Sequence, residues 1–131
     1  MTLLPVGLGV LAAFLLVLVG RWVGGRRENR VYAAGLVVAA LIYVLLALVG
    51  GTSGREVGVE LVGLALFGAV ALIGMRFPLA IGLGWLGHVL WDVVLHRPPE
   101  AWVPEWYPAL CLGFDVAVGL YVSLISWRSA R

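Results

Sequence analysis

Charged residues are scarce in this chain, and their scarcity excludes most classes of soluble protein. The 131 residues include no lysine, nine arginines and seven carboxylates, so that 12% are charged while 63% are hydrophobic. A soluble domain carries about 25% charged residues. The formal charge of +2, with no basic helix and no aromatic RNA-binding pattern, argues against a nucleic-acid partner. The composition therefore predicts a protein whose partner is the lipid bilayer.

Other absences narrow the class further. Cysteine occurs once, as Cys111, which cannot form an intrachain disulfide. The chain lacks the alternating apolar and polar ten-residue segments of a membrane β-barrel. Its first apolar run has no basic region before it, and Arg21 follows in place of a small-residue cleavage site, so we do not expect a signal peptide. An α-helical, multi-pass membrane protein is the expectation that remains.

Five apolar runs predict five transmembrane helices in a single domain over residues 1–131. Runs of about twenty residues, rising ~1.5 Å per residue, are long enough to cross a hydrocarbon core of ~30 Å. Arg76 interrupts the hydrophobicity between the third and fourth runs, and Pro78 suits the first turn of a new helix. The expected spans are about 3–20, 31–50, 57–75, 78–96 and 106–127.

The arginines predict how the chain is oriented, because cytoplasmic loops are enriched in basic residues. The 21–30 segment carries four arginines, the 75–77 turn carries one and the C-terminal tail carries two. With five spans these segments share one side, and the opposite side carries only Arg55 and Arg97. We therefore expect the N-terminus outside and the C-terminus in the cytoplasm, in the cytoplasmic (inner) membrane of a bacterium.

Polar residues recur every four positions on the last two spans, which a short loop joins. Spans four and five are therefore expected to be antiparallel neighbours, with each series of polar residues on one helix face. At ~1.5 Å per residue, successive pairs then lie at the outer boundary, ~6 Å deep and ~12 Å deep. In that order the predicted pairs are His96 with Tyr107, Asp92 with Cys111, and His88 with Asp115.

Burying this set is costly, and the cost suggests a function. A lone aspartate near the bilayer centre opposes insertion by roughly 2.5–3.5 kcal/mol. We expect His88, Asp92 and Asp115 to form an outward-facing pocket that acts in acid–base catalysis or holds a divalent metal such as zinc. The alternative is a structural clamp in which His88 and Asp115 pin two helices together. Further ligand-binding candidates are Glu60, Trp91, His96, Tyr107 and Cys111.

Three functions are compatible with this pattern. The first is a pocket open to one side of the membrane that binds a small ligand or metal, which would also suit an intramembrane enzyme. The second is proton- or cation-coupled transport, although the inner halves of the last two spans are nearly apolar. The third is an accessory subunit whose polar face meets another membrane protein or a second copy of the chain.

The stretch GWLGHVLWDVVLHRP, followed by VPEWYPALCLGFD, resembles a family of small bacterial integral-membrane proteins of unknown function. The shared pattern is H-x-x-W-D-x-x-x-H, then W-Y-P-x-x-C and an aspartate, and the resemblance covers about a third of the chain. It supports treating these positions as a unit and implies no activity. The matching residues are His88, Trp91, Asp92, His96, Trp106, Tyr107, Pro108, Cys111 and Asp115.

Overall fold

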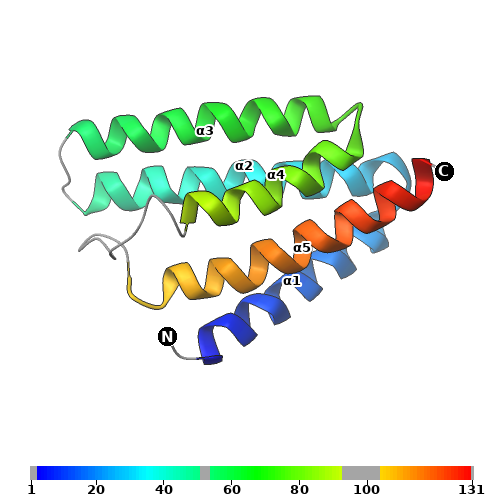
Figure 1. Cartoon of the computed structure of the whole chain (residues 1–131), viewed down its shortest axis with the longest axis horizontal. Coiled ribbons are helices and arrows are strands. Elements are labelled where there is room, and N and C mark those ends of the chain that lie inside the picture. The colour runs from blue at the N-terminus through cyan, green and yellow to red at the C-terminus, as the bar shows by residue number, and fades with distance from the viewer. Residues whose placement is uncertain (1–2, 51–53, 93–103, 131) are drawn as a thin grey trace.

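The computed structural model describes residues 3–50, 54–92 and 104–130, which form a bundle of helices that run alternately up and down (Figure 1). This arrangement confirms the predicted all-α fold with five helices. The helices are α1 (Leu3–Val23), α2 (Gly25–Val49), α3 (Gly54–Gly74), α4 (Pro78–Leu90) and α5 (Tyr107–Ala130).

Four of these helices, α1, α2, α3 and α5, are long and apolar enough to cross a membrane, and they indicate a multi-pass membrane protein. The fourth predicted span, 78–96, is described only in part. Its helix α4 is apolar but has 13 residues, and Trp91 and Asp92 continue it in a wider, π-type turn. The last residues of that predicted span lie outside the described residues.

The junction between α1 and α2 differs from the sequence-based expectation. Residues 21–30 were expected to form a loop, but α1 continues to Val23 and α2 begins at Gly25. Gly24 has a φ of +67°, which favours glycine, and it supplies the turn between the two helices. Hydropathy indicates which residues lie in the hydrocarbon core, and it does not indicate where a helix begins. Arginine and glutamate are good helix formers, so α2 can begin before its apolar segment.

The three segments that together carry most of the arginines lie at one end of the bundle (Figure 1). We call this the arginine-rich end; it holds the α1–α2 junction, the α3–α4 turn and the C-terminus of α5. The opposite, arginine-poor end holds the N-terminus of α1, the end of α4 and the beginning of α5. The segments that were expected to share one side of the membrane therefore do share one end of the bundle.

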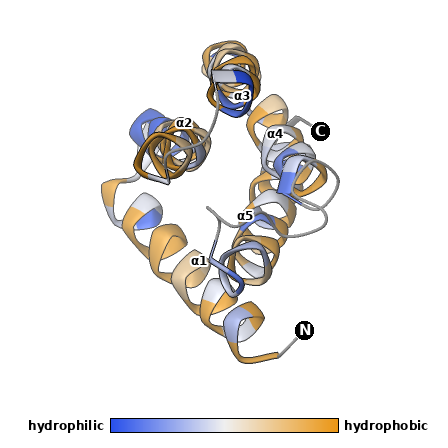
Figure 2. Cartoon of the chain, turned by 90° about the vertical axis from the view of Figure 1, so that its left-hand side faces the viewer, coloured by the Kyte–Doolittle hydropathy of each residue, from blue (hydrophilic) through white to orange (hydrophobic). Residues whose placement is uncertain are grey.

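The helices pack in a closed ring, in the order α1, α5, α4, α3, α2 and back to α1 (Figure 2). Two glycines let α1 and α5 approach closely: a Cβ atom on Gly9 would collide with the carbonyl oxygen of Leu110, and one on Gly113 with that of Val6. Large apolar side chains cover the outside, as with Leu72, which is 75% exposed. Such a surface suits a lipid environment.

Candidate functional site

The candidate site lies between α4 and α5, which run antiparallel. Small residues bring the two helices together, since a Cβ atom on Gly82 would lie only 2.6 Å from the backbone nitrogen of Ser123. Toward the arginine-poor end of the same interface, His88 Nδ1 lies 2.8 Å from Asp115 Oδ2, and both residues are buried. The predicted pairing of these two side chains is confirmed.

Asp92 joins this pair from one helical turn beyond His88. Its Oδ2 atom lies 3.4 Å from His88 Nδ1, and the residue is 1% exposed. One ligand atom from each of His88, Asp92 and Asp115 can be chosen so that all three lie within 4.8 Å of one another. We call these three residues the His/Asp cluster. Among the described residues, His88 Nε2 and both carboxylate oxygens of Asp92 have no hydrogen-bond partner.

Aromatic rings enclose the imidazole of the His/Asp cluster. The ring centroid of Phe67 on α3 lies 4.8 Å from that of His88, edge to face, and the Tyr43 ring on α2 lies 6.0 Å away. Tyr107, at the beginning of α5, packs edge to face on Tyr43 at 5.6 Å. Helices α2 to α5 thus all contribute to the enclosure, and its low polarity strengthens every electrostatic interaction inside it.

The charge of the His/Asp cluster is unbalanced unless something joins it. Two ionised carboxylates beside a neutral imidazole carry two negative charges, and burying uncompensated charge is strongly unfavourable. Protons on the imidazole and one carboxylate would balance the cluster, and so would one divalent cation. The arrangement can therefore exchange protons or hold a metal ion.

One family model matches almost the whole chain, over residues 3–128, and its description is a family of unknown function, DUF6010. The chain belongs to the DUF6010 family. No curated protein and no solved structure matches it. The family assignment agrees with the resemblance found in the last two spans in that both lead to a family of unknown function.

Two other residues that sequence analysis singled out in the DUF6010 chain form a pair of their own. Trp91 Nε1 donates to Glu60 Oε1 at 3.1 Å, and Glu60 is only 2% exposed. The indole lies over Gly63, where a Cβ atom would come within 2.5 Å of it. This pair ties α4 to α3, and Phe67 packs edge to face on the same indole at 5.8 Å.

The remaining predicted residues are distributed unevenly. Cys111 is buried and lies one turn from Asp115 on α5, and Tyr107 lies one turn further toward the arginine-poor end. All three residues line the same cavity. His96, which was predicted to pair with Tyr107, falls outside the described residues.

A second polar group at the arginine-rich end was not predicted. Tyr32 donates to Glu28 Oε2 at 2.7 Å, and Tyr121 on α5 lies 3.5 Å from the same oxygen. Arg21 reaches the Tyr121 hydroxyl at 3.4 Å. The Glu28–Tyr32 spacing of four residues on one helix face was a signal that sequence analysis could have used. The contact between Glu28 and Tyr121, which are 93 residues apart, had no such signal in the sequence.

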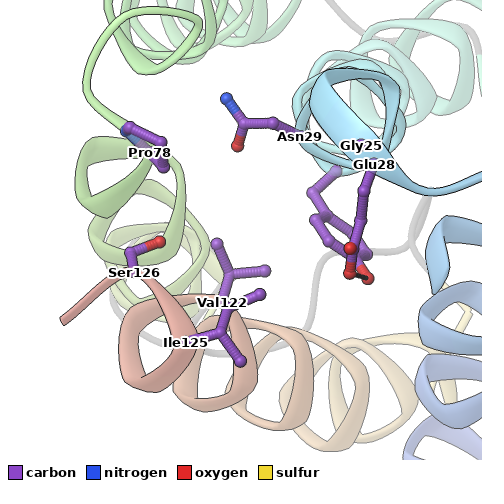
Figure 3. Close-up of a pocket in the computed structure, with 8 residues that line it drawn as sticks. Gly25, Glu28, Asn29, Pro78, Val122, Ile125 and Ser126 are labelled. Atoms are coloured by element: carbon purple, nitrogen blue, oxygen red, sulfur yellow. Dashed lines mark hydrogen bonds between the residues drawn. The ribbon is translucent and has the colours of Figure 1, made fainter. Parts of the chain in front are cut away.

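This second group borders a pocket of about 350 Å³ at the arginine-rich end (Figure 3). The side chains of Glu28 and Asn29 on α2 lie across it from Val122 and Ser126 on α5, with Pro78 beside them at the beginning of α4. Asn29 also donates to the carbonyl oxygen at the end of α3, over 2.8 Å. The polar residues here therefore join helix ends as well as border a pocket.

Proposed function

We propose that the protein binds a divalent metal ion, with zinc as the best fit, through His88, Asp92 and Asp115. The observation that carries this proposal is the His/Asp cluster, whose three potential ligand atoms lie within 4.8 Å of one another. Nitrogen and oxygen ligands of this kind suit zinc, manganese or iron. Tetrahedral ligands about 2.1 Å from one ion are about 3.4 Å apart. His88 Nδ1 and Asp115 Oδ2, now 2.8 Å apart, would therefore have to separate slightly, and His88 Nδ1 would give up its hydrogen bond to Asp115.

Charge and hydrogen bonding both favour this occupant. A divalent cation would neutralise two carboxylates beside a neutral imidazole. It would also use lone pairs on the buried carboxylate of Asp92, whose oxygens have no hydrogen-bond partner among the described residues. A structural clamp needs only His88 and Asp115, which already lie 2.8 Å apart. The second carboxylate, Asp92, would be a ligand in a metal site, whereas in a clamp it would add only the longer contact of 3.4 Å between its Oδ2 and His88 Nδ1.

Three protein ligands would leave a coordination position open. Structural zinc sites are usually closed by four protein ligands, whereas catalytic sites keep a position for water or substrate. The proposed site is of the second kind, which is the basis for proposing a small-molecule ligand and an intramembrane enzyme. The cluster is buried within a closed ring of helices, which argues against an accessory subunit that offers it to a partner.

We place the arginine-rich end in the cytoplasm, following the rule that basic residues accumulate there. The cytoplasmic membrane of a bacterium is the location that fits this rule. Asp115 lies eight residues into α5, so the His/Asp cluster is ~12 Å from the beginning of that helix at the arginine-poor end. The pocket would then lie in the outer half of the membrane.

Metal titration of the purified full-length protein tests this proposal. After treatment with a chelator, the wild type in detergent should bind one Zn²⁺ per chain, and Co²⁺ should give the visible absorption of a site with nitrogen and oxygen ligands. His88→Leu and Asp115→Leu should abolish both. Glu28→Gln removes a carboxylate at the opposite end of the bundle and should bind as the wild type does. Absence of stoichiometric binding in the wild type would refute the proposal.

A further inference from the structure

A long apolar groove adjoins the His/Asp cluster. It lies between α1, α2 and α5 and has a volume of about 430 Å³, which falls within the ~300–1,000 Å³ of small-molecule pockets. Its walls come from Ala12 and Leu16 on α1, from the α2 face between Val31 and Ile42, and from Phe114 on α5. The groove is therefore built almost entirely from hydrocarbon.

The groove follows from the way α1 crosses the bundle (Figure 2). Near its beginning, α1 is held against α5 by the close contact of Gly9 with Leu110. Near its end it is held against α2, where a Cβ atom on Gly20 would lie 2.5 Å from the Tyr32 hydroxyl. Between these two contacts Ala12 on α1 and Ala34 and Ala39 on α2 present only small side chains to the groove.

The length of the groove suits an extended hydrocarbon chain. From Val31 to Ile42 the α2 wall extends roughly 16 Å, at about 1.5 Å per residue. At the same rise per residue, this wall begins ~10 Å from the arginine-poor end of α2 and continues toward the arginine-rich end. A hydrocarbon chain whose polar group lies at the His/Asp cluster would therefore lie along the wall across the middle of the bilayer.

One edge of the groove is polar, and this edge is part of the candidate site. Tyr107, Cys111 and Asp115 line it at four-residue intervals along α5. Asp115 belongs both to the groove and to the His/Asp cluster, where it lies 2.8 Å from His88 Nδ1. A purely hydrocarbon occupant would leave this carboxylate facing apolar atoms, which is unfavourable. An occupant with a polar group at one end could place that group beside the carboxylate.

We infer that the ligand of the His/Asp cluster is a lipid. Its hydrocarbon chain lies in the groove between α1, α2 and α5, and its polar group, an oxygen ligand such as a carboxylic acid that keeps its proton so that the cluster stays neutral, reaches the cluster past Asp115. This inference rests on the proposed function, because the open coordination position of the metal is what receives the polar group. It adds the substrate class and the route by which the substrate enters, sideways from the membrane.

Photolabelling of the zinc-loaded full-length protein in detergent tests the inference. The probe is a palmitic acid analogue with a mid-chain diazirine and a terminal alkyne, and the labelled positions are mapped by mass spectrometry. Label should concentrate on the groove walls, in 12–16 of α1 and 31–42 of α2. Ala39→Phe, which fills the groove, should reduce this labelling at least about tenfold, equivalent to about 1.4 kcal/mol. Leu72→Phe, on the exposed face of α3, should leave it unchanged.

Two competitors distinguish a site that recognises a polar group from a surface that binds any hydrocarbon. Unlabelled palmitic acid should displace the probe at least about tenfold more effectively than hexadecane, which has the same chain and no polar group. Equal competition, or labelling that Ala39→Phe does not reduce, would overturn the inference. Zinc content measured on the same samples keeps the two proposals apart. Zinc binding without groove labelling refutes only the lipid. Groove labelling without zinc binding refutes the metal and the coordination of the polar group by it, and leaves the hydrocarbon chain in the groove.

Discussion

Asp92 is the residue whose replacement best separates a binding site from a structural clamp. Its Oδ2 atom lies 3.4 Å from His88 Nδ1, and its Oδ1 atom has no hydrogen-bond partner among the described residues. A buried polar atom without a partner costs about 1–3 kcal/mol, and more when it is charged. Asp92→Asn removes the charge at nearly constant volume. The metal-free variant should therefore be as stable as the wild type, or up to about 2 kcal/mol more stable.

With zinc present, the wild type should become more stable than Asp92→Asn. A ligand present at 100 times its Kd stabilises the folded state by about 2.7 kcal/mol. At roughly 4 °C per kcal/mol for a chain of this size, the wild type should gain about 10 °C in Tm. Asp92→Asn has lost a metal ligand, so zinc should raise its Tm only slightly. The assay is thermal unfolding of both proteins in one detergent, with either a chelator or zinc present.

The control is Glu28→Gln, which changes a carboxylate outside the His/Asp cluster. This variant loses part of the interaction with Tyr32 and should keep the full zinc-dependent shift in Tm. The reasoning is refuted if Asp92→Asn destabilises the chelated protein by more than about 1 kcal/mol while zinc shifts neither protein. Asp92 would then be a structural partner of His88.

The remaining predictions concern topology and packing. Reporter fusions after Arg30 and Arg131 should both read cytoplasmic, and opposite readings would refute the proposed orientation. Gly113→Leu should destabilise the protein by about 1–3 kcal/mol in thermal unfolding, because α1 backbone occupies the space, whereas Gly68→Leu, which meets nothing within 4 Å, should not. Trp91→Phe should lower the free energy of unfolding by about 1–3 kcal/mol, because Glu60 loses a hydrogen-bond donor. Thermal unfolding that shows equal stability of the variant and the wild type would contradict the importance of that bond.

The sequence predicts the geometry of the His/Asp cluster because that geometry is mostly local. Four-residue spacing sets which face each side chain occupies, and a short loop makes α4 and α5 antiparallel neighbours. Those two facts suffice to bring His88 opposite Asp115. The beginning of α2 was predicted six residues late, since hydropathy reports the extent of lipid contact and not the end of the helix. The Glu28–Tyr121 contact depends on how the ring of helices closes, which no periodicity in the sequence encodes.

The layer between the two polar groups of residues bears on whether the protein forms a conduit. Leu36, Ile81, Trp85 and Val118 are all 0% exposed and lie between the His/Asp cluster and the Tyr32–Tyr121 pair. Trp85 is held in place because its Nε1 donates to the Tyr32 carbonyl oxygen at 3.1 Å. A proton or cation crossing this layer would meet several side chains that offer no oxygen or nitrogen ligand, at the large cost of desolvation. A pathway would require Trp85 to leave a hydrogen-bonded, closely packed position. The same layer suits a site that must stay closed toward one side, which is what a metal centre supplied with ligand from the membrane requires.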